Sequence, residues 1–202
     1  MPDMSVRVDP FNWLVQGRLG FELEVGVWEF LSFELVPVFV VNEQPPSLNL
    51  RGVEDTVTQH SNGIGAMSGA SFGLGFWLSG EPFEGNVLRL VLTNYGYTFR
   101  GGTNSAGEQD EVSHTERVLM GMFGTHYKWE FFTLAFAFGL GWELNQETRC
   151  VRSDEQILTG DDCPDKGLHI DYIDGREVGQ ASLDGPLSPA VLAMRLSLGF
   201  VF

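Results

Sequence analysis

A short segment of the sequence contains residue types that could carry out hydrolysis. His60, Ser61, Asn62 and Gly63 follow one another directly, and a histidine that reaches a serine hydroxyl can act as the general base that makes it a nucleophile. Neighbouring side chains of an extended strand point to opposite faces, so a turn at Asn62 and Gly63 would have to bring His60 and Ser61 together. We expect a polar loop end here, with a catalytic His60–Ser61 pair as the alternative.

Charged residues recur at alternate positions within apolar segments of the chain. If these segments are strands, the charged side chains share one face and are buried together, where each charge needs an opposite partner. We expect a cluster of ion pairs that plugs the interior, and the alternative is a path for protons or ions through the carboxylates. The residues concerned are Glu22, Glu24, Glu34, Arg89, Glu143 and Arg195, with Arg18 as a further candidate.

Two cysteines, Cys150 and Cys163, lie within the most acidic part of the sequence. A disulfide between them fits an oxidising compartment and would contribute about 3 kcal/mol. A metal site is the alternative, but neither a C-x-x-C pair nor nearby histidines accompany the cysteines. The acidic residues between Asp154 and Asp165 do not have EF-hand spacing. The sequence therefore predicts a disulfide, no metal and no cofactor.

The segments that position these residues have the two-residue period of β-strands. The last segment is the clearest, because large apolar residues at its even positions, Leu192 to Phe202, alternate with smaller or polar ones. The longest nearly apolar run, 131–142, is shorter than the roughly 20 residues of a membrane-spanning helix. We predict eight strands, at about 5–15, 18–27, 30–42, 63–79, 86–100, 116–127, 131–145 and 189–202.

Connections of two lengths join the predicted strands. The connections after the second, fourth and sixth strands are short, whereas those after the third, fifth and seventh are long and cover about 43–62, 101–115 and 146–188. Alternating short and long connections place all the short turns at one rim, together with both chain ends. We therefore predict that residues 1–202 form a single all-β domain, an eight-stranded antiparallel up-and-down β-barrel.

The two faces of the predicted strands differ in side-chain size. In the seventh strand, for example, Phe136 and Phe138 share one face while Ala135 and Ala137 share the other. An eight-stranded barrel has room inside only for packed side chains, so the phenylalanines must face outward, where a large apolar surface is suited to lipid. We predict a transmembrane barrel with a plugged lumen. A soluble lipocalin-like barrel, with its apolar row inside around a ligand, is an alternative.

The last strand resembles the closing strand of bacterial outer-membrane β-barrels. That family's assembly signal combines a polar residue, a small residue and two late hydrophobic residues ending in an aromatic, and Arg195, Ser197, Phe200 and Phe202 occupy these places. The chain as a whole is similar in pattern to small barrels of the OmpX and OmpA-barrel type. The resemblance implies a Gram-negative outer-membrane protein that contacts outer-membrane lipids and the barrel-assembly machinery, with periplasmic termini and extracellular long loops.

The same resemblance implies a function in surface binding, adhesion or envelope architecture, without enzymatic activity. The segment from His60 to Gly63, in turn, resembles the histidine-serine-asparagine stretch of outer-membrane lipid hydrolases of the phospholipase A and lipid A deacylase types. In those families one residue separates the histidine from the serine, whereas His60 and Ser61 are adjacent. A lipid hydrolase that uses His60, Ser61 and Asn62 is therefore the alternative function.

The formal net charge of −15 lies mainly in the three long connections. Such a chain is poorly suited to nucleic acid, because nucleic-acid binding requires basic patches that neutralise phosphates. The charge favours instead a protein partner with a basic face at the extracellular loops. The sequence begins without a charged and then apolar leader, so we expect that a secretion signal has been removed.

Overall fold

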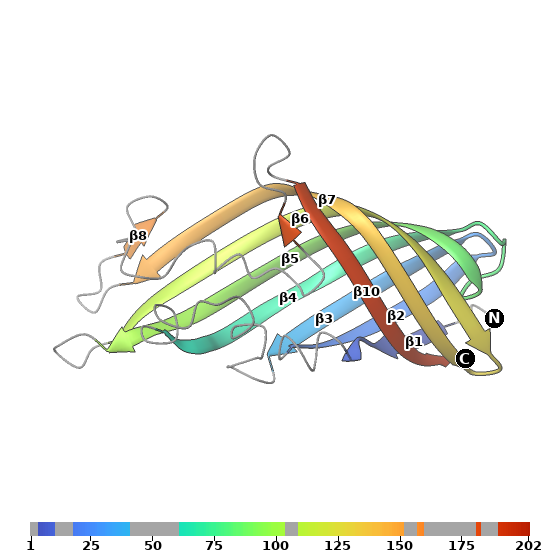
Figure 1. Ribbon diagram of the computed structural model, residues 1–202, viewed down its shortest axis with the longest axis horizontal. Helices are drawn as coiled ribbons and strands as arrows, with labels where there is room; N and C mark the ends of the chain where they lie inside the picture. The colour runs from blue at the N-terminus through green and yellow to red at the C-terminus, as the bar shows by residue number, and fades with distance from the viewer. Residues whose placement is uncertain are drawn as a thin grey trace.

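In a computed structural model of the chain, the β-strands form one sheet, and eight of them close into a barrel (Figure 1). The structure describes residues 4–10, 18–40, 61–103, 109–151, 157–159, 181–182 and 190–202. None of the described segments is a helix of the length and apolar character that crossing a membrane requires. The strands are β1 (Met4–Val8), β2 (Arg18–Trp28), β3 (Leu31–Val40), β4 (Ser61–Trp77), β5 (Gly85–Thr103), β6 (Gln109–Trp129), β7 (Phe132–Val151), β8 (Ile157–Thr159), β9 (Ala181–Ser182) and β10 (Ala190–Val201).

The barrel closes between the first and the last strand. β1 to β7 pair with one another in sequence order, and β10 pairs with β7 on one side and with β1 on the other. All of these pairings are antiparallel, and the short strands β8 and β9 add to β7 and β10. The structure therefore confirms the prediction of an eight-stranded antiparallel β-barrel.

The strands differ in length from the predicted ones. β5 and β6 continue past the predicted strands 86–100 and 116–127, and β7 continues to Val151, so the connection between β5 and β6 is shorter than the predicted 101–115. The prediction ended these strands where the apolar alternation ends, but backbone pairing continues as far as the pair of Glu111 with Val151. Polar strand ends are stable because the paired backbone groups satisfy one another. β1 is shorter than the predicted 5–15, and residues 11–17 lie outside the described residues.

Large apolar side chains cover the outside of the barrel, and the inside holds small and polar side chains together with a few larger apolar ones such as Trp77, Phe83 and Met120. Two glycines show how tight the interior is: a Cβ atom on Gly73 would lie 3.0 Å from Glu34 Oε2, and one on Gly75 would lie 2.5 Å from Ser32 Oγ. Glycine at these places leaves room for the longer inward side chains of β3. The outward apolar residues include Phe21, Leu23, Val25, Phe33, Leu35, Phe72, Phe76, Leu88, Leu90, Leu92, Leu119, Phe123, Phe136, Phe138, Leu140, Trp142, Leu192, Met194, Leu196, Leu198 and Phe200.

Both marked chain ends lie at the rim that carries the short turns, and the long strands β4 to β7 extend toward the opposite rim (Figure 1). The backbones of Met4 and Phe202 exchange two hydrogen bonds of 3.1 and 2.8 Å at the short-turn rim. In the turn between β4 and β5, Phe83 has a left-handed backbone (φ 67°) and a fully buried side chain. A positive φ is unfavourable for a phenylalanine, so the packing of its ring inside the barrel mouth must offset this strain.

Candidate functional site: a charged cluster inside the barrel

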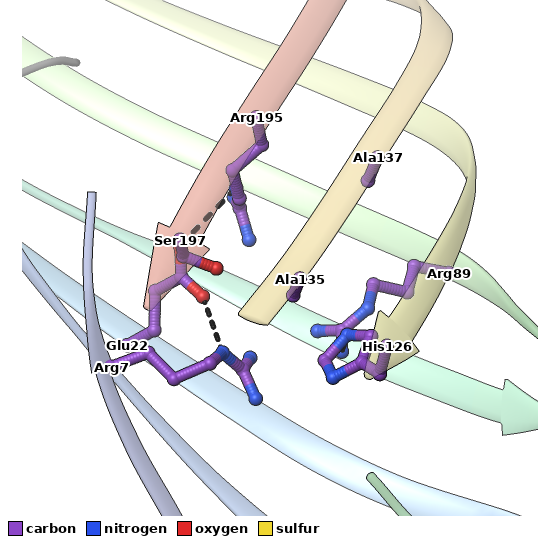
Figure 2. Close-up of a pocket in the computed structure, with 8 residues that line it drawn as sticks. All are labelled: Arg7, Glu22, Arg89, His126, Ala135, Ala137, Arg195 and Ser197. Carbon is purple, nitrogen blue, oxygen red and sulfur yellow. Dashed lines mark hydrogen bonds and ion pairs between the residues drawn. The ribbon is translucent and has the colours of Figure 1, made fainter. Parts of the chain in front are cut away.

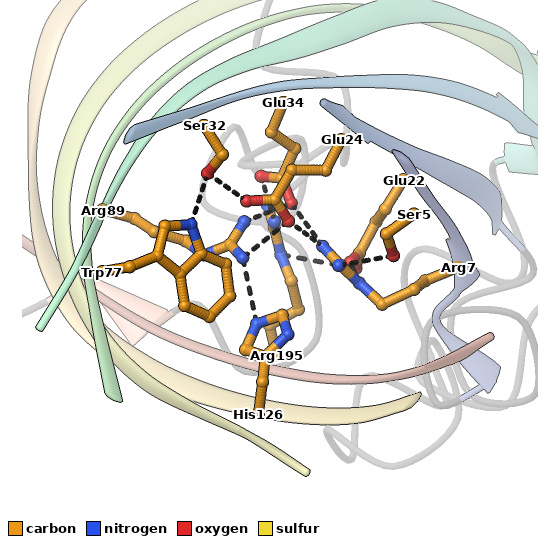
Figure 3. Close-up of polar contacts among 10 residues, drawn as sticks. All are labelled: Ser5, Arg7, Glu22, Glu24, Ser32, Glu34, Trp77, Arg89, His126 and Arg195. Atoms are coloured by element: carbon orange, nitrogen blue, oxygen red, sulfur yellow. Dashed lines mark hydrogen bonds and ion pairs between the residues drawn. The ribbon is translucent and has the colours of Figure 1, made fainter. Parts of the chain in front are cut away.

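Charged and polar side chains from most strands of the barrel meet in its interior near the short-turn rim (Figure 3). We call this group the lumen cluster. Its side chains come from β1, β2, β3, β4, β5, β6 and β10, whereas the inward residues of β7 at this level are small. The lumen cluster consists of Ser5, Arg7, Glu22, Glu24, Ser32, Glu34, Trp77, Arg89, His126 and Arg195.

Arg7 of β1 is the most connected residue of the lumen cluster, and it is 1% exposed. Its Nε donates to Glu22 Oε2 at 2.9 Å, and one terminal nitrogen donates both to Glu24 Oε2 at 2.7 Å and to Glu34 Oε1 at 3.0 Å. The other terminal nitrogen donates to Ser5 Oγ at 2.9 Å. Arg7 can satisfy three carboxylates at once because a guanidinium has five N–H donors in a planar fork.

Two further arginines reach the same carboxylates from the other side of the lumen. Arg89 of β5 donates to Glu34 Oε1 at 2.5 Å and to Glu24 Oε2 at 2.8 Å. Arg195 of β10 donates to Glu34 Oε2 at 2.8 Å, and its Nε lies 3.8 Å from a carboxylate oxygen of Glu22. Glu34 therefore bonds to all three arginines, which join β1, β3, β5 and β10 across the interior.

Uncharged polar groups complete the lumen cluster at the β4 side. Trp77 Nε1 donates to Ser32 Oγ at 2.9 Å, and this hydroxyl donates to the free oxygen of Glu24 at 2.5 Å. The indole ring of Trp77 also lies beneath the Arg89 guanidinium, with 5.8 Å between the ring centroid and Cζ. A cation placed over an aromatic face, as the Arg89 guanidinium is here, is attracted to it. The imidazole of His126 meets the indole edge-on, with ring centroids 4.8 Å apart.

Three arginines and three glutamates make the lumen cluster electrically neutral when every group is charged. The carboxylates of Glu22, Glu24 and Glu34 are 2%, 0% and 4% exposed, so water does not solvate them. Buried charges are tolerated when each is paired and hydrogen-bonded. The arrangement can therefore hold the barrel wall together across its interior. Each of these three carboxylates is engaged by at least one arginine.

A small cavity of about 10 Å³ lies beside the lumen cluster, on the side of β7 and β10 (Figure 2). The cavity forms on this side because the inward side chains of β7, Ala135 and Ala137, are too small to fill the space. His126 Nε2 lies 3.0 Å from Arg89, and since arginine can only donate, the imidazole nitrogen accepts and the proton sits on Nδ1. Nδ1 is buried without a protein partner among the described residues. The cavity has room for about one water molecule, which makes it a hydration site and too small for an organic substrate.

Two apolar layers enclose the lumen cluster along the barrel axis. Toward the short-turn rim, the rings of Trp77 and Phe83 meet edge to face with centroids 5.6 Å apart and pack with Val87 and Val201. Toward the long-loop rim, inward apolar side chains of β5, β6, β7 and β10 pack against one another. This second layer consists of Val91, Val118, Met120, Met122, Ala137, Val191 and Ala193. An apolar layer, a neutral ion-pair layer and another apolar layer therefore follow one another along the described part of the interior.

The structure brings five of the six predicted lumen charges together: Glu22, Glu24, Glu34, Arg89 and Arg195. Glu143 lies elsewhere. It is on the inward row of β7 six residues beyond Ala137, about 20 Å further along the strand, opposite Val118. Arg18, the further candidate, begins β2 opposite Val40, and its side chain lies outside the described part of the structure.

Sequence reasoning missed Arg7, Trp77 and His126. The alternation of Ser5, Arg7 and Asp9 with Val6 and Val8 could have identified Arg7, but Pro10 interrupts the strand pattern directly after Asp9. His126 had no such signal, because both faces of β6 carry apolar residues.

The other predicted site residues lie in different parts of the chain. His60 lies outside the described residues, and the side chains of Ser61 and Asn62, at the start of β4, are not described either. The catalytic pair therefore stays a prediction. Cys150 is in β7, whereas Cys163 is outside the described residues. The described part of the chain contains no disulfide, and the predicted pairing also stays a prediction.

The residues of the predicted assembly signal divide between the two faces of β10. Arg195 and Ser197 point inward, and Ser197 is 1% exposed, while Phe200 and Phe202 point outward and are 48% and 70% exposed. Arg195, which the resemblance assigns to an assembly signal, is therefore also a member of the lumen cluster. The assembly signal itself stays a prediction.

The fold and the lumen cluster together define the chain as a small, closed, antiparallel β-barrel with a packed and charged interior. A comparison of the chain with protein families, curated proteins and solved structures finds no significant match. The function proposed below is therefore based on the two surfaces of the barrel and on its interior.

Proposed function

We propose that this chain is an integral outer-membrane β-barrel of a Gram-negative bacterium, with a sealed lumen. In this proposal it serves envelope architecture or surface binding through its long acidic connections, which face the outside of the cell. The observation that carries the proposal is the continuous apolar outer surface around an interior that contains a buried layer of charged residues. Soluble barrels bury their apolar side chains inside, whereas a membrane barrel has the opposite arrangement.

The outer apolar surface has the height of a bilayer core. On β10 the outward row runs from Leu192 to Phe202, which is about 33 Å of strand at about 3.3 Å per residue. A strand tilted by about 40° covers about 25 Å along the barrel axis, which agrees with the apolar band of about 25 Å in outer-membrane barrels. The middle of this row, at Leu196 and Leu198, is 39% and 36% exposed.

Exposed aromatic rings are concentrated at the short-turn rim. The rings of Trp28 and Phe30, in the turn between β2 and β3, stack with centroids 6.3 Å apart, and those of Tyr127 and Trp129 stack at 6.1 Å. Between Trp129 and β7, Phe131 stacks on Phe200 of β10. Aromatic rings favour the boundary between the hydrocarbon and the lipid head groups, so this rim would lie at the periplasmic interface.

The closed lumen supports a role other than transport. Three successive packed layers fill the barrel, and the lumen cluster satisfies its own charges. In this proposal the function resides in the long connections, whose negative charge favours a partner with a basic face. The last strand, β10, would be the part that the barrel-assembly machinery recognises.

A pair of arginine substitutions tests the membrane proposal. Leu90 is 46% exposed in the middle of the outward row of β5, and Asn86 is exposed on the same strand at the short-turn rim. In vesicles, Leu90→Arg should lower the free energy of unfolding by about 2–4 kcal/mol, whereas Asn86→Arg should cost about 0–1 kcal/mol. The readouts are urea unfolding in vesicles and the mobility of unboiled protein on gels. Equal small effects of both substitutions, with a parent protein that stays soluble without detergent, would refute the proposal.

A further inference from the structure

The outward polar and apolar residues of β5, β6 and β7 meet at a sharp boundary. Leu92, Leu119 and Trp142 are paired across the three strands and form the last apolar row that spans all of them, and all three are exposed; on β7 the exposed Leu144 lies beyond this row. The next row toward the long-loop rim consists of Asn94, Arg117 and Asn145, which are paired in the same way. We call these three residues the boundary triad. The two rows are about 7 Å apart along the strands.

A β-bulge places the third member of the boundary triad on the outer face. The strict alternation of β7 puts Asn145 on the inward face, together with Glu143. In the structure the register of β6 and β7 shifts between Arg117 and Val118, so Leu144 and Asn145 are both exposed. A bulge adds one residue to a strand and redirects the side chains that follow it, and here it adds an amide group beside the guanidinium.

Arg117 is held in position by its neighbour on β5. Its Nε donates to Asn94 Oδ1 at 2.9 Å, and this bond lies at the exposed surface. The two terminal nitrogens of Arg117 make no hydrogen bond or ion pair with another residue whose side chain the structure describes. Because the bond to Asn94 uses Nε, the fork of terminal N–H groups remains available for a planar or tetrahedral anion.

The charge around the boundary triad is unusual for this chain, which has a net charge of −15. Among the described outward residues of β5, β6 and β7 between the two rims, Arg117 is the one charged side chain. The nearest acidic neighbour in the chain, Glu116, points inward and is 2% exposed. Among the side chains that the structure describes, an anion that approaches this face from outside the barrel meets one cation and the amide groups of Asn94 and Asn145, all of which can donate hydrogen bonds.

We propose that the boundary triad binds the phosphate group of an anionic lipid at the long-loop rim. This inference rests on the proposed membrane location, since it requires lipid against the outer surface. The phosphate would accept two hydrogen bonds from the Arg117 fork and further ones from the two amides, while the acyl chains lie along Leu119 and Trp142. Bidentate pairing of arginine with phosphate is a strong, charge-assisted interaction. The site also fixes the depth of the barrel, because phosphates lie just outside the hydrocarbon.

Native mass spectrometry of the folded protein in a phosphate-free maltoside detergent tests this site. Phosphatidylglycerol is titrated into the parent protein, into Arg117→Gln and into Lys128→Gln, which removes a positive charge at the opposite rim. The parent should retain one phosphatidylglycerol more tightly than the rest. Arg117→Gln should weaken this binding about tenfold, as expected for the loss of a charge-assisted pair, and Lys128→Gln should leave it unchanged. Equal binding by Arg117→Gln, or equal loss in both variants, would overturn the proposal.

Further arms of the experiment separate the possible sources of the phosphate. Dioleoylglycerol, which has the acyl chains without the phosphate, should not bind at this site, and inorganic phosphate at the same concentration should not displace phosphatidylglycerol. Displacement by inorganic phosphate would refute a lipid site. Asn94→Leu, which removes the bond that positions Arg117, should weaken binding a few-fold and serves as a second variant if Arg117→Gln fails to fold.

Insertion of the parent protein into vesicles, measured beside the detergent titrations, distinguishes this inference from the proposed function. If the parent protein does not insert into vesicles, the membrane proposal and the lipid site both fail. If the parent inserts and Arg117→Gln binds phosphatidylglycerol as tightly as the parent does, only the lipid site fails.

Discussion

Replacing Arg7 by methionine removes the residue with the most contacts in the lumen cluster and retains a side chain of similar length. Arg7 donates hydrogen bonds to Glu22, Glu24 and Glu34, and all three glutamates are buried. Each bond to a charged group contributes about 1.5–3 kcal/mol. The substitution does not cost the full sum of these contributions, because Glu24 and Glu34 keep their bonds to Arg89 and Glu34 also keeps its bond to Arg195. We expect Arg7→Met to lower the free energy of unfolding by about 3–5 kcal/mol, as for other broken buried ion pairs.

Whether a second substitution raises or lowers the free energy of unfolding of the Arg7→Met protein tests the electrostatic reason for this loss. Arg7→Met leaves two arginines against three glutamates, so the cluster carries one uncompensated negative charge. Glu22 depends mainly on Arg7, because its other contact, to Arg195, is 3.8 Å long. Adding Glu22→Gln to Arg7→Met should therefore restore about 1–3 kcal/mol, a coupling in the range measured for contacting residues.

Urea unfolding in lipid vesicles, followed by tryptophan fluorescence and by gel mobility without boiling, measures these free energies. Ser5→Ala is the control, since it removes one bond to Arg7 without changing the charge and should cost about 1 kcal/mol. The reasoning is refuted if Arg7→Met costs less than about 1 kcal/mol, or if Glu22→Gln destabilises the Arg7→Met protein further.

Three other predictions concern the mouth of the barrel, its closing seam and its cysteines. Phe83→Ala should lower the free energy of unfolding by about 3 kcal/mol or more, measured by urea unfolding, because the ring of Phe83 is fully buried; a loss below about 1 kcal/mol would show that the ring does not seal the mouth. Gly199→Ala should reduce the yield of folded barrel on gels, because its Cβ would overlap backbone atoms of β1, whereas Gly121→Ala, whose Cβ meets nothing within 4 Å, should fold like the parent. Cys150 and Cys163 should react with a maleimide only after reduction, and labelling of the unreduced protein, followed by mass spectrometry, would contradict the disulfide.

The barrel itself could be predicted because its alternation is strong. A row of large apolar residues opposite a row of glycine, alanine and charged residues determines which face of each strand is outside, and the alternating connection lengths determine the strand order. The prediction also identified Glu24, Glu34, Arg89 and Arg195 as interior residues, because each lies in a strand with clear alternation.

The remaining parts of the site could not be predicted, for different physical reasons. His126 lies in a strand with apolar residues on both faces, so the period of two does not determine its direction. The outward position of Asn145 results from a β-bulge, which adds one residue and reverses the alternation. Phe83 is in a turn, where sequence patterns favour exposure, and only the packing inside the barrel mouth explains its burial.

The lengths of the strands were also hard to predict. Hydrophobic alternation ends at the edge of the apolar surface, but the hydrogen-bonded ladders of β5, β6 and β7 continue beyond it through polar residues such as Ser113 and Thr148. Backbone pairing does not depend on apolar side chains, so a pattern based on hydrophobicity underestimates how far such strands extend.

Spin-label accessibility at Met194 tests the membrane location of the barrel most directly. Met194 is exposed within the outward apolar row of β10, between Leu192 and Leu196, and Glu29 is exposed in a short turn at the rim. Nitroxide labels are attached to Met194→Cys and, as the reference, to Glu29→Cys, in a protein whose two native cysteines are replaced by serine. After insertion into vesicles, the label at position 194 should collide with oxygen and be protected from a water-soluble nickel chelate, while the label at position 29 should show the reverse. Equal access of the nickel chelate to both labels would contradict the assignment of this chain as a membrane barrel.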